Sequence, residues 1–185
     1  MKKQSFVFES IKKLTLAAML TAMSVVIGIF CKSYLNFGSG LFRVTFEHLP
    51  IIVSGIVLGP VGGAMIGAAS DLISYLLSPQ IYPPNLIVTF GAAVVGVIPG
   101  IVSRFIIKKN GYKQIIVSGI FAHVFSSVII KSIGLFTFYH WSILWRIPLY
   151  LFAVAPIEIV LICLLYKNRS CRKILGWNSK RMNYK

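Results

Sequence analysis

Acidic residues are scarce in this chain, which has 4 Asp and Glu against 19 Lys and Arg and a formal net charge of +15. The basic residues lie in the two tails and in a few short loops between apolar runs. Nucleic-acid binding needs a basic face or stripe on a folded domain, which this placement does not provide. We therefore expect no nucleic-acid partner and use the charge as a guide to membrane topology.

Cysteine pairs and catalytic motifs are also missing. Cys31, Cys163 and Cys171 form neither a C-x-x-C pair nor a zinc-ligand spacing, so we expect no metal and no redox role. The sequence contains no phosphate-binding G-x-x-x-x-G-K-[ST], no H-E-x-x-H and no G-x-S-x-G. We predict that the chain is not an enzyme, that it carries no cofactor, and that any ATP hydrolysis belongs to a partner.

Apolar residues dominate what is there: 57% of the residues are hydrophobic and the mean hydropathy is +0.82. This composition predicts an all-α polytopic membrane protein with one domain, residues 1–185. A spanning helix needs about 20 mostly apolar residues. Six segments meet or approach that length, at 11–30, 44–58, 61–77, 86–107, 114–136 and 145–166. The first run reaches Phe30 without a signal-peptide cleavage site, so we expect a permanent span.

The basic residues predict the orientation of these six spans, because cytoplasmic loops retain Lys and Arg. Four lie in the N-terminal segment, four between Arg104 and Lys113, and seven from Lys167 onward, all on one side of a six-span chain. The other side has only Lys32, Arg43 and Arg146 near span ends. Both termini are therefore predicted to be cytoplasmic.

Five charged side chains from four predicted spans fall at one depth, toward the outer side. They are Arg43, Glu47, Asp71, Lys131 and Arg146. A charge at the bilayer centre costs about 2.5 to 3.5 kcal/mol on insertion scales, so such residues mark polar pathways or ligand sites. Three bases against two acids leave a positive charge that a bound anion would balance. The alternatives are internal pairs, Arg43 with Glu47 on one helix face and Lys131 with Asp71, and an Arg146 side chain that reaches the headgroups.

Two further polar residues are predicted to be structural. Glu158 falls near mid-membrane, away from the outer charges, and follows Pro156, so it can satisfy backbone groups freed by a kink. His123 has no second histidine three or four residues away, which favours a hydrogen-bonded packing role.

Aromatic residues crowd the predicted outer connections, among them Tyr75 and Trp141. One interpretation is the aromatic belt of a membrane interface. The other is a lid that stacks on a planar ligand. The loop from Ser78 to Asn85 contains three prolines and no charge, which indicates a shaped cap.

Small residues recur at four-residue spacing in two spans. Ala18 and Ala22 form such a pair in the first span, and Gly59, Gly63 and Gly67 continue the pattern in the third. This spacing lets helix backbones approach closely in lipid. It predicts either packing within the bundle or docking of another membrane subunit on Ala18, Ala22, Gly63 and Gly67.

Two runs of sequence resemble a known family. They are Phe42-Arg43-Val44-Thr45-Phe46-Glu47-His48-Leu49-Pro50-Ile51 and the stretch from Leu58-Gly59-Pro60 to Ser70-Asp71-Leu72. They are similar to the substrate-binding S components of energy-coupling factor (ECF) vitamin transporters, and most similar to the folate members. The first-span pair Ala18 and Ala22 resembles the A-x-x-x-A motif by which such proteins meet their transmembrane scaffold.

The resemblance implies a six-helix vitamin binder in a bacterial cell membrane, partnered by a scaffold subunit and two ATPases, that carries its ligand inward by toppling. For folate it implies cations for the two tail carboxylates, with Arg43, Lys131 and Arg146 as candidates. Glu47 or Asp71 is then expected to accept from the pterin amino group. Tyr75, Phe90 and Trp141 are the candidates for stacking. Where relatives show Tyr-x-Pro-Gly followed by an aromatic, this chain has Tyr82-Pro83-Pro84-Asn85-Leu86.

Three other functions remain open from the sequence. One is an S component for another planar vitamin, such as thiamine or a pyridoxine-like compound, although a cationic ligand suits a positive pocket less well. Another is a membrane assembly subunit that transports nothing. The third is an intramembrane enzyme acting on lipid, for which the sequence shows no converging nucleophile or metal ligands.

Overall fold

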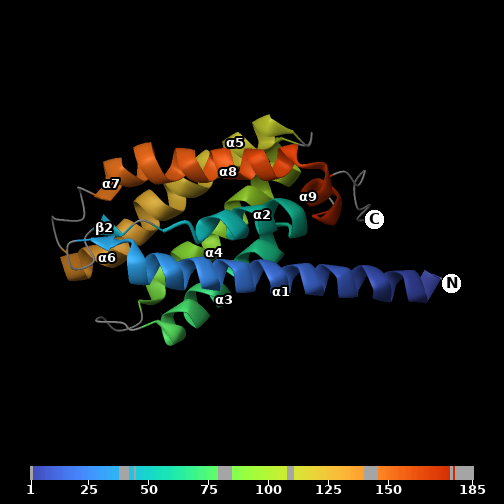
Figure 1. The fold of residues 1–185 in the computed structure, drawn as a ribbon, viewed down its shortest axis with the longest axis horizontal. Helices are drawn as coiled ribbons and strands as arrows, with labels where there is room; N and C mark the ends of the chain where they lie inside the picture. The colour runs from blue at the N-terminus through green and yellow to red at the C-terminus, as the bar shows by residue number, and fades with distance from the viewer. Residues whose placement is uncertain are drawn as a thin grey trace.

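A computed structural model describes residues 2–37, 42–43, 45–78, 85–107, 111–139, 146–175 and 177 of the 185-residue chain. Side chains are described for most of them, but not for 2–10, 36–37, 42–43, 137–139, 146 and 149. The described part is a bundle of helices with their axes roughly parallel to one long direction (Figure 1). The predicted all-α class is confirmed, apart from one short ladder that pairs β1 (Asn36–Phe37) with β2 (Phe42–Arg43).

The chain begins with α1 (Lys2–Tyr34), the longest described helix, whose first turns project beyond the bundle (Figure 1). After β1 and β2 come α2 (His48–Leu58) and α3 (Pro60–Leu77). Gly59 separates α2 from α3 with a φ of 91°, a left-handed conformation that favours glycine, and Pro60 then starts α3 with its fixed φ. Arg104 donates to the Leu58 carbonyl oxygen at 3.1 Å and so satisfies an acceptor at the end of α2.

The second half of the chain alternates α-helical and π-helical turns. Helix α4 (Leu86–Ile101) continues as the π-helical segment Val102–Ile106. Helix α5 (Tyr112–Ala122) passes through the π-helical segment His123–Ile130 into α6 (Lys131–Tyr139). The short α7 (Arg146–Leu149) leads through Tyr150–Val154 into α8 (Ala155–Lys167), and α9 (Arg169–Ile174) follows.

Five described segments are long and apolar enough to cross a membrane. They are Ile11–Tyr34, Pro60–Leu77, Leu86–Ile106, Tyr112–Phe136 and Tyr150–Lys167. The sixth predicted span, 44–58, differs: Phe42–Arg43 is a strand, Glu47 precedes the helix, and α2 has only 11 residues. A helix of that length covers about 16 Å at 1.5 Å per residue, roughly half of the hydrocarbon thickness.

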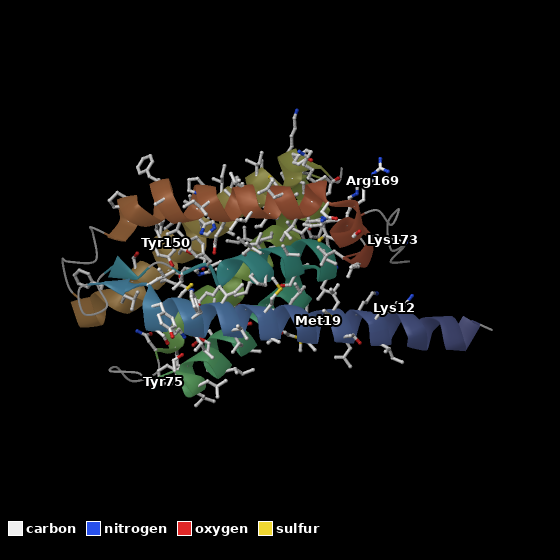
Figure 2. All side chains as sticks on the ribbon, viewed as in Figure 1. Lys12, Met19, Tyr75, Tyr150, Arg169 and Lys173 are labelled. Carbon is white, nitrogen blue, oxygen red and sulfur yellow. The ribbon has the colours of Figure 1, made fainter. Side chains whose placement is uncertain are left out.

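The two chain ends lie at the same end of the bundle, together with α9, whereas β2, α6 and α7 lie at the opposite end (Figure 1). Figure 2 shows the basic side chains of Lys12, Arg169 and Lys173 at the end with the termini, and Tyr75 and Tyr150 toward the other. The labelled basic residues from the first and last parts of the chain therefore gather at one end of the bundle. Which side of the membrane this is stays a prediction.

Close backbone contact joins α3 to α4. A Cβ atom added to Gly63 would lie 2.4 Å from the carbonyl oxygen of Gly96, and one added to Gly67 would lie 2.2 Å from that of Ala92. Both glycines are buried. Gly63 and Gly67 therefore serve packing within the bundle, which is one of the two alternatives that their spacing predicts, and docking of a partner on this pair is not tested by these contacts.

Candidate functional site

A cluster of buried charged and imidazole side chains lies inside the bundle, where α2, α6, α8 and the π-helical segment His123–Ile130 meet. Its members are Glu47, His48, His123, Lys131 and Glu158, with exposures of 8%, 0%, 2%, 3% and 0%. We call these five residues the buried cluster. Ionisable groups so deep in a membrane-spanning bundle are costly unless paired, and they mark functional sites by default.

Lys131 links the first part of the cluster. Its Nζ lies 2.8 Å from Nε2 of His48 and 3.7 Å from Oε1 of Glu47. An ammonium group can only donate, so Nε2 of His48 accepts and the ring proton resides on Nδ1. This assignment follows from the distance only for a charged Lys131, which requires the neutral His48 tautomer with its proton on Nδ1.

Glu158 links the second part of the cluster. Its Oε2 lies 2.9 Å from Nε2 of His123, and its Oε1 lies 3.9 Å from Nδ1 of His48. The contact between His123 and Glu158 is within ion-pair distance, but its angles are poor for a hydrogen bond. The two rings also meet edge to face, with centroids 5.7 Å apart. A continuous sequence of contacts therefore runs from Glu47 through Lys131, His48 and Glu158 to His123.

Neighbouring residues hold the Glu47 end in place. Ser24 of α1 donates to the backbone carbonyl oxygen of Glu47 at 2.8 Å. Gly28, one turn further on, leaves room for the carboxylate, because an added Cβ would lie 2.8 Å from Oε2 of Glu47. Thr45 and Tyr150 join through a hydrogen bond between their hydroxyl groups, and the Tyr150 ring lies 6.2 Å from that of His48. The site is thus built where α1 packs against the start of α2.

A second group of polar residues lies along α3. Asp71 accepts a hydrogen bond from Thr89 of α4 at 2.7 Å, and Lys32 of α1 donates to Ser74. Ser74 is also 3.2 Å from the Cβ position of Gly28, which places this group beside Glu47. Tyr75 follows directly and is half-buried. Carboxylate, ammonium and hydroxyl groups therefore gather beside one face of α1, at Gly28.

The structure places the predicted site residues unequally. Glu47 and Lys131 come together in the buried cluster, and Asp71 and Tyr75 lie nearby on α3. Phe90 is 63% exposed and shares the outward face of α4 with Leu86, at 81%, so the structure does not place it beside the cluster.

Three predicted residues cannot be placed by their side chains. Arg43 belongs to β2 and Arg146 starts α7, but only their backbones are described. Trp141 lies outside the described residues.

Three sequence-based interpretations of the charges are wrong. Arg43 and Glu47 do not share a helix face, because one is in a strand and the other is the residue before α2. Glu158 does not stand apart from the other charges, since it contacts His48, which is bonded to Lys131. The expected pairing of Lys131 with Asp71 is replaced by contacts with His48 and Glu47.

The sequence did not single out four polar residues that lie in or beside the buried cluster. They are His48, His123, Lys32 and Tyr150. One signal was available for His48, which follows the conspicuous charge of Glu47 directly in an otherwise apolar run. His123 and Glu158 come from helices 35 residues apart in sequence, and no local spacing connects them. Within the described residues, no three side chains of His, Cys, Asp or Glu are arranged to hold a metal ion.

Ala18 and Ala22 lie on an exposed face of α1, unlike the glycines of α3. The same face carries Leu14 at 71% and Val26 at 66% exposure. Apolar exposure on this scale is ordinary for a helix that faces lipid or another membrane subunit.

Helices long and apolar enough to cross a membrane, packed around a buried charged site, define a membrane protein with an internal polar site. The chain matches the family described as "ECF transporter, substrate-specific component" over residues 12–170. It therefore belongs to the substrate-specific components of ECF transporters, as the resemblance of the two sequence runs indicates.

Known proteins that are similar to this chain include the following two. The folate transporter FolT of Clostridium novyi (strain NT) is 28% identical over 98 residues, which are 52% of this chain and 55% of that protein. The match thus spans about half the length of that relative. The crystal structure of FolT bound with folic acid has 22% sequence identity and a TM-score of 0.65, covering 89% of this chain and 96% of the other. At that identity the structure establishes the shared fold.

Proposed function

We propose that this chain is the folate-binding subunit of an ECF-type importer. Membership of the substrate-specific family supports a solute-binding role, and the similarity to FolT supports folate among the vitamins. The observation that carries the proposal is the buried cluster, in which Lys131 lies between the Glu47 carboxylate and the His48 ring.

Folate matches the chemistry of this site in two respects. Its glutamate tail carries two carboxylates, for which Lys131 and, at the same end, Arg43 and Arg146 supply cations. Its pterin ring carries an amino group and ring N–H donors, for which the carboxylates of Glu47 and Asp71 are acceptors. The rings of Tyr75 and Trp141 are the proposed stacking partners, and Tyr150 joins them because it lies beside His48.

Transport requires partners that supply the energy. We propose that the chain docks onto a membrane scaffold subunit through the exposed face of α1 with Ala18 and Ala22, and that two ATPase subunits drive the cycle. Both termini are proposed to be cytoplasmic, with α2 completing a six-helix membrane domain. The bound vitamin then moves inward as the subunit topples. Each of these steps follows from the family and not from the geometry of the isolated chain.

Ligand identity is tested by mass spectrometry of small molecules released from the purified, denatured protein, followed by titration calorimetry with folic acid and thiamine. The proposal predicts that folate is released and that folic acid binds whereas thiamine does not. Release of another vitamin would keep the transport role and overturn the ligand. Repeated release of nothing, together with no thermal stabilisation by any vitamin, would favour a membrane assembly subunit.

Site identity is tested by charge reversal at Lys131. The variant Lys131→Glu is expected to weaken folic acid binding far more than it lowers the yield of folded protein, because loss of a buried charged partner costs about 2 to 5 kcal/mol in binding. Lys12→Glu is the matched control, since Lys12 is exposed at the end with the termini (Figure 2). Equal loss of folding and binding in Lys131→Glu, or binding at the wild-type affinity, would remove Lys131 from the site.

A further inference from the structure

Polar side chains line the buried face of the fifth span along most of its length. They are Gln114, Ser118, His123, Ser126, Ser127 and Lys131, none more than 3% exposed. We call this row the polar seam. It begins at the end of the bundle that holds the termini, where α5 starts, and reaches the opposite end at α6 (Figure 1). Gln114 and Lys131 are 17 residues apart, which corresponds to roughly 25 Å at 1.5 Å per residue.

The π-helical segment His123–Ile130 keeps the seam on one face. Successive residues of the seam lie at positions 114, 118, 123, 127 and 131. The spacing is five residues from Ser118 to His123 and four residues elsewhere in this series. The five-residue step coincides with the start of the segment, where each turn takes up an extra residue. In an uninterrupted α-helix with 3.6 residues per turn, the row would drift away from the bundle interior.

Besides the two facing atoms of the His123–Glu158 contact, five buried atoms of the seam and of Glu158 have no hydrogen-bond partner among the described residues. They are Gln114 Oε1, Ser118 Oγ, His123 Nδ1, Ser127 Oγ and Glu158 Oε1. Other polar atoms of the seam do have protein partners, since Gln114 Nε2 donates to the Ser103 carbonyl oxygen at 3.2 Å and Ser126 donates to that of Gly91. A polar atom that is buried without a partner is expensive, above all within a bilayer.

We propose that the polar seam binds a file of internal water molecules, which solvates the His123–Glu158 pair from the end of the bundle where α5 begins. A bound water needs two to four polar partners, and the unpartnered atoms of Gln114, Ser118 and Ser127 supply them in succession. The file reaches His123 Nδ1 and Glu158 Oε1, which leaves the His123–Glu158 contact intact. It thus adds solvation to the Glu158 carboxylate, which the described residues contact only through the rings of His123 at 2.9 Å and His48 at 3.9 Å.

Radiolytic footprinting tests for this water without any vitamin. Hydroxyl radicals formed from a bound water modify the side chains that touch it, even where bulk solvent is excluded. His123 is expected to be modified rapidly at 2% exposure. Cys31 is the internal control, because it has the same 2% exposure and a more reactive side chain but lies on α1, which packs against α2 and α3. The proposal predicts faster modification of His123 than of Cys31.

A paired set of variants assigns the modification to the seam. In Ser118→Ala/Ser127→Ala, two water partners are removed without filling space, so the modification of His123 is expected to fall several-fold. Thr21→Val is the matched control, since its hydroxyl donates to the Ala17 carbonyl oxygen on α1 at 2.9 Å, and it is expected to leave the modification unchanged.

Thermal unfolding supplies an independent measurement. If the seam is dry, removal of two unpartnered hydroxyl groups raises the melting temperature; if it binds water, the melting temperature falls or stays the same. Unmodified His123 in the wild type, or a higher melting temperature of Ser118→Ala/Ser127→Ala, overturns the proposal.

Discussion

The ring of His123 meets the carboxylate of Glu158 inside the bundle, with Nε2 2.9 Å from Oε2 and both side chains at most 2% exposed. One residue comes from the π-helical part of the fifth span and the other from the first turn of α8. This contact ties the last span to the one before it. It also brings Glu158 beside His48, and through His48 to Lys131.

Replacement of one member of this pair is expected to be more harmful than replacement of both. His123→Leu leaves the Glu158 carboxylate buried beside one distant partner, His48, and should lower the free energy of unfolding by about 3 to 5 kcal/mol. The double variant His123→Leu/Glu158→Leu removes the charge as well and should regain much of that loss. Thermal unfolding of the purified protein in detergent measures both. A double variant no more stable than His123→Leu would show that the pair carries no coupled charge.

Much of the fold could be predicted from the sequence, because a spanning helix must be long and apolar whatever it packs against. The spans at 11–30, 61–77, 86–107, 114–136 and 145–166 each overlap a described helix of suitable length. The segment 44–58 was misjudged because its apolar run includes Val44 to Phe46, which hydropathy cannot separate from a helix. There the chain emerges from a short ladder and α2 starts only at His48.

The candidate site could be predicted only in part. Glu47, Asp71 and Lys131 were identified because a charge in an apolar run is conspicuous by itself. The partners of Lys131 could not be identified from the sequence, because its contacts with His48 and Glu47 join residues that are 83 or more positions apart. Glu158 was not expected in the cluster, because its position along an apolar run does not reveal its contacts with His48 and His123 across the bundle.

Asn85 joins two helices, and its two functions can be separated by substitution. Its Oδ1 accepts from the backbone N–H of Ile87 at 2.9 Å and so caps α4, while its Nδ2 donates to the Gly134 carbonyl oxygen of α6 at 2.7 Å. Asn85→Ala loses both and should cost about 1 to 3 kcal/mol in stability. Asn85→Asp keeps the cap but cannot donate to Gly134, so it should lie between Asn85→Ala and the wild type in thermal unfolding. Equal stability of the two variants would mean that the cap contributes nothing.

Gly28 offers a way to disturb the site while the helices stay in place. A Cβ atom at this position would lie 2.8 Å from Oε2 of Glu47, whose side chain can move where backbone cannot. Gly28→Ala is therefore expected to displace the Glu47 carboxylate and weaken folic acid binding by about tenfold, which corresponds to about 1.4 kcal/mol. The melting temperature should change little, since alanine favours a helix over glycine by about 1 kcal/mol. Calorimetry and thermal unfolding check the two expectations, and unchanged affinity in a correctly folded variant would place Glu47 outside the binding site.

Gly96 is the position where an added methyl group should do most harm. Its Cβ would lie 2.1 Å from the backbone carbonyl oxygen of Gly63, and neither backbone can move without separating α3 from α4. Overpacking of this kind typically costs about 1 to 3 kcal/mol, and contact with backbone belongs to the severe end. We expect Gly96→Ala to reduce sharply the yield of protein that elutes as a single species in size-exclusion chromatography. Gly111→Ala is the matched control, because no atom of the described residues lies within 4 Å of its Cβ position and its φ of 175° is open to any residue. If Gly96→Ala folds as well as Gly111→Ala, the close approach of α3 and α4 is not required for the bundle.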